Sequence, residues 1–302
     1  MVQSDQANGR AELGAFLRSR RARLRPEDTG LRTFGERRRV PGLRREELAQ
    51  LAGVSVDYYV RFEQGRAANV SDAVVGAVAA ALRLDGTETG HLHRLVRTAS
   101  GASRAPGAAP APAAPAAQRV RPGLMNLLAS MPGTPAFIVG RRTDILAWNP
   151  LFARLITDFS ALPEARRNKA WLVFLHEETR GRFVNWETKA RDLVGYLRLD
   201  RGRHPQDPDF ARLVAELSEH SVEFRRLWEL QEVREKTHGG YHLRHPEAGE
   251  FTLAYESLSL PDDPDQTLIM YTAEPGSPSE AALRILAAST LDPATVLTGA
   301  PA

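Results

Sequence analysis

The stretch Arg44–Gly65, RREELAQLAGVSVDYYVRFEQG, has the pattern of two short helices that meet at a steep angle. Ala49 is small where the helices would approach most closely, and Gly53, four residues later, suits a left-handed turn because it has no Cβ. Ser55 can cap the second helix, since its hydroxyl can accept a hydrogen bond from a free backbone N–H. The stretch therefore predicts a helix-turn-helix that ends at Gly65.

The second helix of this pair has one apolar face and one mixed face. Tyr59 and Phe62 are three residues apart, so we expect both to face the core. In DNA complexes of this motif the opposite face enters the major groove, where Arg61 can bind guanine, Asp57 can bind cytosine, and valines can pack on thymine methyls. The residues predicted to contact DNA are Arg44, Arg45, Ser55, Val56, Asp57, Tyr58, Val60 and Arg61.

Positive charge is concentrated at the N-terminal end of the chain. Residues 1–100 hold 17 arginines against 12 acidic residues, whereas residues 101–302 hold 23 basic against 25 acidic residues. A codon bias explains arginine in place of lysine, but it does not explain why the excess lies at one end. Arg45 is expected to reach a phosphate, and Arg37, Arg38 and Arg39 add to the positive field. The alternative is a helical bundle that binds protein.

The chain divides into two domains at a stretch rich in alanine and proline. Residues 99–119 contain Pro106, Pro110, Pro112 and Pro115 without apolar periodicity, which indicates a linker. Before it, apolar residues at helical spacing predict an all-α domain of five helices over residues 11–98. After it, residues 120–290 form the second domain.

The pattern of the second domain indicates an α+β fold with one antiparallel sheet. Strand-like segments lie at both ends of the domain and helical segments lie between them. The expected strands are Ala136–Gly140, Ile145–Trp148, Tyr241–Arg244, Glu250–Leu260 and Gln266–Ala273. The expected helices are Pro150–Thr157, Glu177–Leu199, Pro208–Glu219, Val222–Leu230 and Pro278–Ala288.

The stretch Arg44–Gly65 resembles the Xre/Cro-type helix-turn-helix, and residues 11–98 resemble that domain throughout. The basic lead-in RRRVPGLRREELAQLAG is similar to that of the MmyB-like regulators of actinobacteria. The resemblance continues over residues 120–278. It is carried there by DILAWNP (144–150), RRN (166–168), FVNWETKA (183–190), HPQDPDF (204–210), LVAEL (213–217), FRRLW (224–228), HPEAGEF (245–251) and MYTAEPG (270–276).

The resemblance implies a PAS-like second domain with a pocket that holds a fatty acid in at least one relative. The chain departs from the family at Gln231 and Glu232, where relatives tend to carry His-Asp, so a role tied to that pair does not carry over. From the residues alone, aromatic side chains can line an apolar pocket, although they can equally form the core. The ligand candidates are Phe137, Trp148, Phe174, Phe183, Trp186, Phe224, Trp228 and Tyr271, with Arg234 as the cation for a carboxylate.

Catalytic, metal and membrane functions are not expected. The chain has no cysteine, and it lacks the common nucleophile, phosphate-loop and zinc-protease motifs. In a strand, His238 and His242 would share one face and His245 the other, so solvated turn histidines are favoured over a metal site. No long apolar run and no signal-like N-terminus occur, so a cytoplasmic protein is expected. No cofactor is expected either.

We therefore expect a transcription regulator that binds double-stranded DNA as a homodimer and is not an enzyme. Its second domain is expected to sense a small apolar molecule, which the resemblance suggests is fatty-acid-like. The alternative is that this domain serves only dimerisation or the binding of a protein partner.

Overall fold

The computed structural model describes residues 2–30, 41–67, 69–100, 117–235 and 237–288. The chain forms two compact units, which are treated separately below. Most of the predicted linker, residues 101–116, and the three arginines Arg37, Arg38 and Arg39 lie outside the described residues. Among the described residues, every helix is too short or too polar to cross a lipid bilayer.

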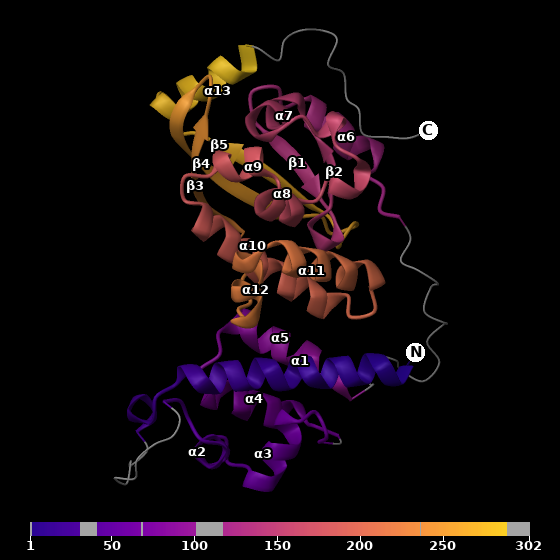
Figure 1. The fold of residues 1–302 in the computed structure, drawn as a ribbon, viewed down its shortest axis with the longest axis vertical. Helices are drawn as coiled ribbons and strands as arrows, with labels where there is room; N and C mark the ends of the chain where they lie inside the picture. The colour runs from indigo at the N-terminus through magenta and orange to yellow at the C-terminus, as the bar shows by residue number, and fades with distance from the viewer. Residues whose placement is uncertain (1, 31–40, 68, 101–116, 236, 289–302) are drawn as a thin grey trace. The chain divides into compact units, whose positions relative to one another are not determined.

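The first unit contains five α-helices over its described residues, as predicted. Figure 1 shows α1 running alongside α5, with α2 and α3 below them. The core forms where the apolar faces meet, and Phe16 of α1 packs edge-on against His91 of α5 with ring centroids 5.1 Å apart. The helices are α1 (Val2–Arg23), α2 (Arg45–Leu51), α3 (Val56–Glu63), α4 (Asp72–Ala81) and α5 (Gly86–Ala99), with a 3-10 turn, η1, at Pro26–Thr29.

Two short segments from later in the chain, Arg201–Asp207 and Glu229–Arg234, also belong to the first unit. Val233 is buried in the same apolar core as α1. The Arg20 guanidinium of α1 donates a hydrogen bond to the carbonyl oxygen of Gln231 at 2.8 Å and pairs with Glu88 at 2.8 Å. The core of the first unit therefore includes residues that a reading by sequence order assigns to the second domain.

The second unit is built on a five-stranded antiparallel sheet in the order β2-β1-β5-β4-β3, the PAS-like sheet that was expected. The two N-terminal strands pair with each other, and β1 then pairs with the last strand, which brings the ends of the domain together. The strands are β1 (Ala136–Val139), β2 (Ile145–Trp148), β3 (His238–His245), β4 (Gly249–Ser259) and β5 (Thr267–Thr272).

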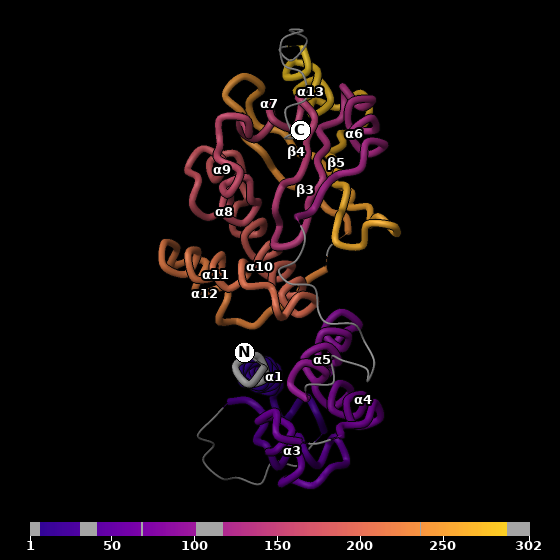
Figure 2. Tube along the Cα trace, turned by 90° about the vertical axis from the view of Figure 1, so that its right-hand side faces the viewer, coloured from indigo at the N-terminus to yellow at the C-terminus, as the bar shows by residue number. Residues whose placement is uncertain are grey.

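The sheet is covered on both faces. Phe137 and Val139 of β1 point into a large core, whereas Ala136 and Ile138 point into a smaller one with Leu128 of α6, as the two-residue period of a strand requires. Figure 2 shows α8 and α9 on one side of the sheet and α6 on the other. The helices are α6 (Pro122–Ala129), α7 (Pro150–Ile156), α8 (Lys169–Leu175), α9 (Glu177–Arg182), α10 (Trp186–Arg203), α11 (Pro208–His220), α12 (Val222–Glu229) and α13 (Pro278–Ala288).

The helices of this unit differ from the predicted ones at three places. Helices α6 and α8 were not predicted, and the single helix expected over Glu177–Leu199 is two helices, α9 and α10. The break occurs because Phe183 bridges Leu243 of β3, and the Val184 N–H donates to the His242 carbonyl oxygen at 2.9 Å. A tertiary contact with the edge strand therefore takes the backbone hydrogen bonds that a continuous helix would use.

Candidate functional site

The turn between α2 and α3 has the geometry that its sequence predicts. Gly53 adopts a φ of +65°, the left-handed region that favours glycine. The Val54 N–H then donates to the Ala49 carbonyl oxygen at 3.0 Å, which closes the end of α2. Ala49 is fully buried, so its small side chain lies in the core beside this turn.

Helix α3 is capped and anchored from its inner side. The Ser55 hydroxyl accepts a hydrogen bond from the Tyr58 N–H at 3.2 Å, with Ser55 itself in an extended conformation. Tyr59 and Phe62 are buried in the core, as predicted, and Gly65 ends the helix region with a φ of +65°. The position of α3 is therefore set by its buried face, which leaves the other face available.

The outer face of α3 consists of Val56, Asp57, Val60 and Arg61, of which all but the half-buried Val60 are exposed. Val56 is 41% exposed, and few large apolar side chains are exposed among the residues that the structure describes. Arg61 and Asp57 form an exposed ion pair one helical turn apart, with a nitrogen–oxygen distance of 3.1 Å. This pair is weak in water, so either side chain can exchange its partner for a base edge. Tyr58 is half-buried beside this face.

Two of the residues predicted to contact DNA, Arg44 and Arg45, also stabilise the fold. The Arg44 N–H donates to the Glu47 carboxylate at 2.6 Å and begins α2. The Arg45 guanidinium donates to the Glu63 carboxylate at 2.8 and 3.0 Å, which raises the pKa of Arg45. The Arg45 side chain remains 42% exposed, so the portion that Glu63 does not cover can bind a phosphate.

Glu63, which the sequence reasoning did not single out, connects three helices. Its side chain is 1% exposed and binds Arg45 of α2 and Arg21 of α1, the latter at 3.1 Å. The signal in the sequence was an acid directly after Phe62, on the buried side of an amphipathic helix. This buried carboxylate therefore ties α3 to both α1 and α2.

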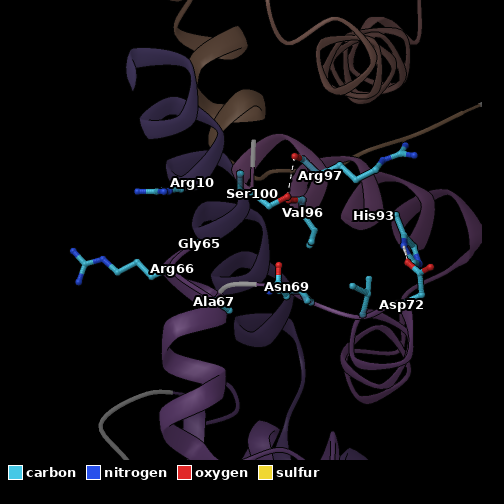
Figure 3. A pocket seen from close by; sticks show the side chains of 13 residues that line it. Arg10, Gly65, Arg66, Ala67, Asn69, Asp72, His93, Val96, Arg97 and Ser100 are labelled. Atoms are coloured by element: carbon cyan, nitrogen blue, oxygen red, sulfur yellow. Dashed lines mark hydrogen bonds and ion pairs between the residues drawn. The ribbon is translucent and has the colours of Figure 1, made fainter. Parts of the chain in front are cut away.

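A hollow lies beside the C-terminal end of α3, with a volume of about 740 Å³ (Figure 3). Its walls come from α1, the α3–α4 connection, α4 and α5, and Asp72 of α4 pairs with His93 of α5 at 3.3 Å. In Figure 3 the Arg10, Arg66 and Arg97 side chains extend away from the hollow rather than converging in it. The lining residues are Arg10, Gly65, Arg66, Ala67, Asn69, Val70, Asp72, Val75, His93, Val96, Arg97, Ala99 and Ser100.

The eight aromatic ligand candidates all belong to the large core of the second unit or pack against it. One group surrounds Phe137, which stacks on Phe152 at 3.9 Å and lies 6.2 Å from the Tyr271 ring. Trp148 joins this group through Phe159. A second group contains Phe174, Trp186, Phe224 and Trp228, and Phe183 lies against Tyr241.

The cation predicted for the ligand, Arg234, belongs to the first unit, whereas the aromatic candidates belong to the second. It pairs with Glu232 at 3.2 Å. The prediction that the three histidines lie in a turn is wrong, because His238, His242 and His245 all belong to β3. His245 is also buried, with its Nε2 3.1 Å from the Arg154 carbonyl oxygen, and it lies on the face opposite His242, as the strand period requires.

The interior of the second unit contains a cationic side chain that was not predicted. Lys189 of α10 is 2% exposed, and its ammonium lies 4.0 Å from the Tyr241 ring centroid and 4.8 Å from that of Phe183. Lys169 of α8 and Asp192 of α10 act on it electrostatically, and we call these three residues the lysine cluster. The sequence signal was Lys189 preceding Ala190 and Leu193 on the apolar side of α10.

Burial dominates the electrostatics of the lysine cluster. It lowers the pKa of Lys169 to about 8 and that of Lys189 well below its usual range, with the charge of Lys169 adding to the latter effect. Asp192 opposes both shifts. Burial likewise raises the pKa of Tyr241, Tyr255 and Tyr271 above the usual value, so their hydroxyls are neutral at physiological pH.

Two family models match the chain in the same order as its two units. Residues 12–92 match a helix-turn-helix domain, and residues 120–286 match the MmyB-like transcription regulator ligand binding domain. The second match covers more than half of the chain. A comparison with curated proteins finds no significant match.

Proposed function

We propose, from the premise that the chain belongs to the family of the MmyB-like transcription regulator ligand binding domain, that it senses a small fatty-acid-like molecule and acts as a cytoplasmic homodimer. The two domain matches make it a DNA-binding transcription regulator with a ligand-binding domain. The finer proposals concern how α3 docks, what the second unit binds and how the chain assembles. No catalytic activity is assigned to it.

The docking proposal rests on one observation: α3 buries Tyr59 and Phe62 and exposes the face that contains Val56, Asp57 and Arg61. A helix held in this way can enter the major groove without unfolding or rearranging its domain. Arg61 would donate to guanine O6 and N7, and Asp57 would accept from cytosine N4. Ser55, the exposed part of Arg45 and the Arg44 region at the start of α2 would approach the phosphates.

Variants of Arg61 and Arg45 test the docking. Arg61→Ala should lose about 1–3 kcal/mol of discrimination at one base pair while keeping its non-specific binding. Arg45→Ala should weaken binding to all sequences and reduce the salt dependence by about one unit of slope, because a phosphate contact is lost. The measurement is selection of DNA sequences followed by titration at several salt concentrations.

A matched control is Arg212→Ala, an exposed arginine of the second unit whose side chain is paired with Asp209. It should change neither specificity nor salt slope. If Arg61→Ala and Arg45→Ala both leave operator binding unchanged while both variants stay folded, the docking proposal is wrong.

The sensing proposal is supported by an interior rich in stacked rings within the family-matched ligand-binding domain. A ligand changes DNA binding only if it binds the DNA-competent and DNA-incompetent arrangements unequally. Native mass spectrometry of the purified chain should find an acyl molecule, and the melting temperature should rise with added alkanoate. An intact dimer that no apolar molecule stabilises would favour the alternative, a domain for dimerisation or a protein partner.

The homodimer proposal follows from how helix-turn-helix proteins read DNA. Two copies related by a two-fold axis would place their α3 helices in successive major grooves, about 34 Å apart. Light scattering of the free protein and of its complex with a palindromic operator tests this directly. A monomer in both measurements would contradict it.

A further inference from the structure

We propose that Lys189 binds the anionic headgroup of the ligand inside the second unit, and that this headgroup is a carboxylate. The inference rests on the proposed sensing function, because it names how that ligand is held. The starting observation is that the buried Lys189 ammonium has fewer hydrogen-bond acceptors than donors.

The Lys189 ammonium has three N–H donors and, among the residues that the structure describes, a single hydrogen bond. That bond reaches the Tyr271 hydroxyl at 3.4 Å, which is long for a charged donor. The side chain is 2% exposed, so bulk water does not supply the remaining acceptors. A buried ammonium in this state is costly unless another acceptor enters the site.

The surroundings of Lys189 favour an anion over a neutral group. Rings of Phe183 and Tyr241 lie against the ammonium, and these contacts offset its charge only in part. Tyr255 stacks on Tyr241 at 5.0 Å and stands opposite Tyr271 in the β4–β5 register. The three tyrosines lie on neighbouring strands, and the Tyr271 hydroxyl, 3.4 Å from the ammonium, is a neutral group that can donate to an anion there.

An anion would also offset the electrostatic cost of the buried lysines. The charged groups that face Lys189 are Lys169 from α8 and Asp192 from its own helix, while the tyrosines of β3, β4 and β5 are neutral. Burial lowers the pKa of both lysines, so a bound anion would favour their protonated forms. We expect a carboxylate, because its acyl chain would extend among the aromatic rings that surround the cluster.

Lys189 and Arg234, the cation that the sequence suggested, belong to different units. Arg234 lies in the first unit with Glu232, whereas Lys189 lies within the ring cluster of the second unit. A headgroup at Lys189 would bond to α10 and, through Tyr271, to β5. Binding would therefore link a helix to the centre of the sheet.

The test compares dodecanoate and hexadecanoate with dodecanol and hexadecanol, which have the same chains and no charge. Binding to the full-length protein is measured by calorimetry at pH 7. The wild-type protein should bind each alkanoate at least tenfold more tightly than its alcohol, a difference of about 1.4 kcal/mol. Lys189→Met should bind acid and alcohol equally, and Lys189→Arg should keep the preference for the acid.

Lys169→Met serves as the matched control, because it removes the neighbouring charge and keeps Lys189; it should retain at least part of the preference. If the alkanoates and alcohols bind equally well to the wild-type protein, the sensing function stands and the role of Lys189 is refuted, whether or not any variant folds. If neither class binds, the proposed sensing function fails, and this inference fails with it.

Discussion

Glu63 in the helix-turn-helix unit and Lys189 in the α+β unit are both charged side chains with almost no exposure, yet their partners differ. Glu63 accepts hydrogen bonds from two guanidinium groups, at 2.8 and 3.1 Å. Lys189 donates one long hydrogen bond, to the Tyr271 hydroxyl at 3.4 Å, and Asp192 acts on it only through a coulombic attraction. The comparison teaches that a buried charge whose hydrogen bonds are all made within the protein stabilises one structure. A buried charge that lacks hydrogen-bond partners can instead bind a ligand.

The largest expected effect comes from removing the satisfied charge. Glu63→Gln leaves two arginines without their counter-charge and should lower the free energy of unfolding of the first unit by about 3 kcal/mol. The helical circular dichroism signal should then be lost in two steps. All four tryptophans belong to the second unit, so their fluorescence reports that unit separately.

Lys189→Met is the comparison variant for Glu63→Gln. It should leave the first-unit transition unchanged, since it acts in the other core. A loss of less than about 1 kcal/mol for Glu63→Gln would show that the ion pairs contribute as little as exposed ones, and the contrast between the two charges would fail.

A smaller effect is expected from pH in the ligand-free second unit. The folded pKa of Lys169, about 8, is below the value of about 10.4 for an unfolded lysine. Between these values the unfolded chain binds more protons, so the free energy of unfolding should rise with pH, by at most about 1.4 kcal/mol per pH unit for one group. Lys189, whose pKa is also lowered, contributes with the same sign.

The tyrosines limit this gain to pH values below about 10. Their raised pKa means that the unfolded tyrosines ionise first, which lowers stability above that pH. Urea unfolding followed by tryptophan fluorescence from pH 7.5 to 9.5 is the measurement. Lys169→Met should flatten the rise, and a wild-type stability that falls over this range would contradict the assigned shift.

The smallest expected change in stability comes from removing an uncharged N-terminal cap of a helix at the surface. Ser55→Ala removes the hydrogen bond to the Tyr58 N–H and should cost about 1 kcal/mol of first-unit stability. Ser71→Ala, which removes the equivalent cap of α4 at 3.3 Å, should cost a similar amount. Only Ser55→Ala should also change DNA affinity, and an equal change in both variants would argue against a direct DNA role for Ser55.

The local features of this protein were predictable because they depend on residues close together in the chain. The turn at Gly53, the Ser55 cap and the inward direction of Tyr59 and Phe62 each follow from spacings of a few residues. The strands of the second unit were located by their alternation, although its helices at 122–129 and 169–175 were not predicted. The helix at 169–175 is buried or half-buried at every position, so it has little periodic signal to read, whereas the short helix at 122–129 buries only Leu124 and Leu128.

What only the tertiary structure decided is the pairing of charges. Arg21 and Glu63 meet across 42 residues, and Lys189 and Tyr271 meet across 82. Arg45 and Arg234 were assigned to ligands on the basis of charge alone, and each has an acidic partner in the fold, Glu63 and Glu232. The sequence by itself determined where helices begin and turn, because backbone hydrogen bonds are local; which buried ions are neutralised depends on chain segments that only folding brings together.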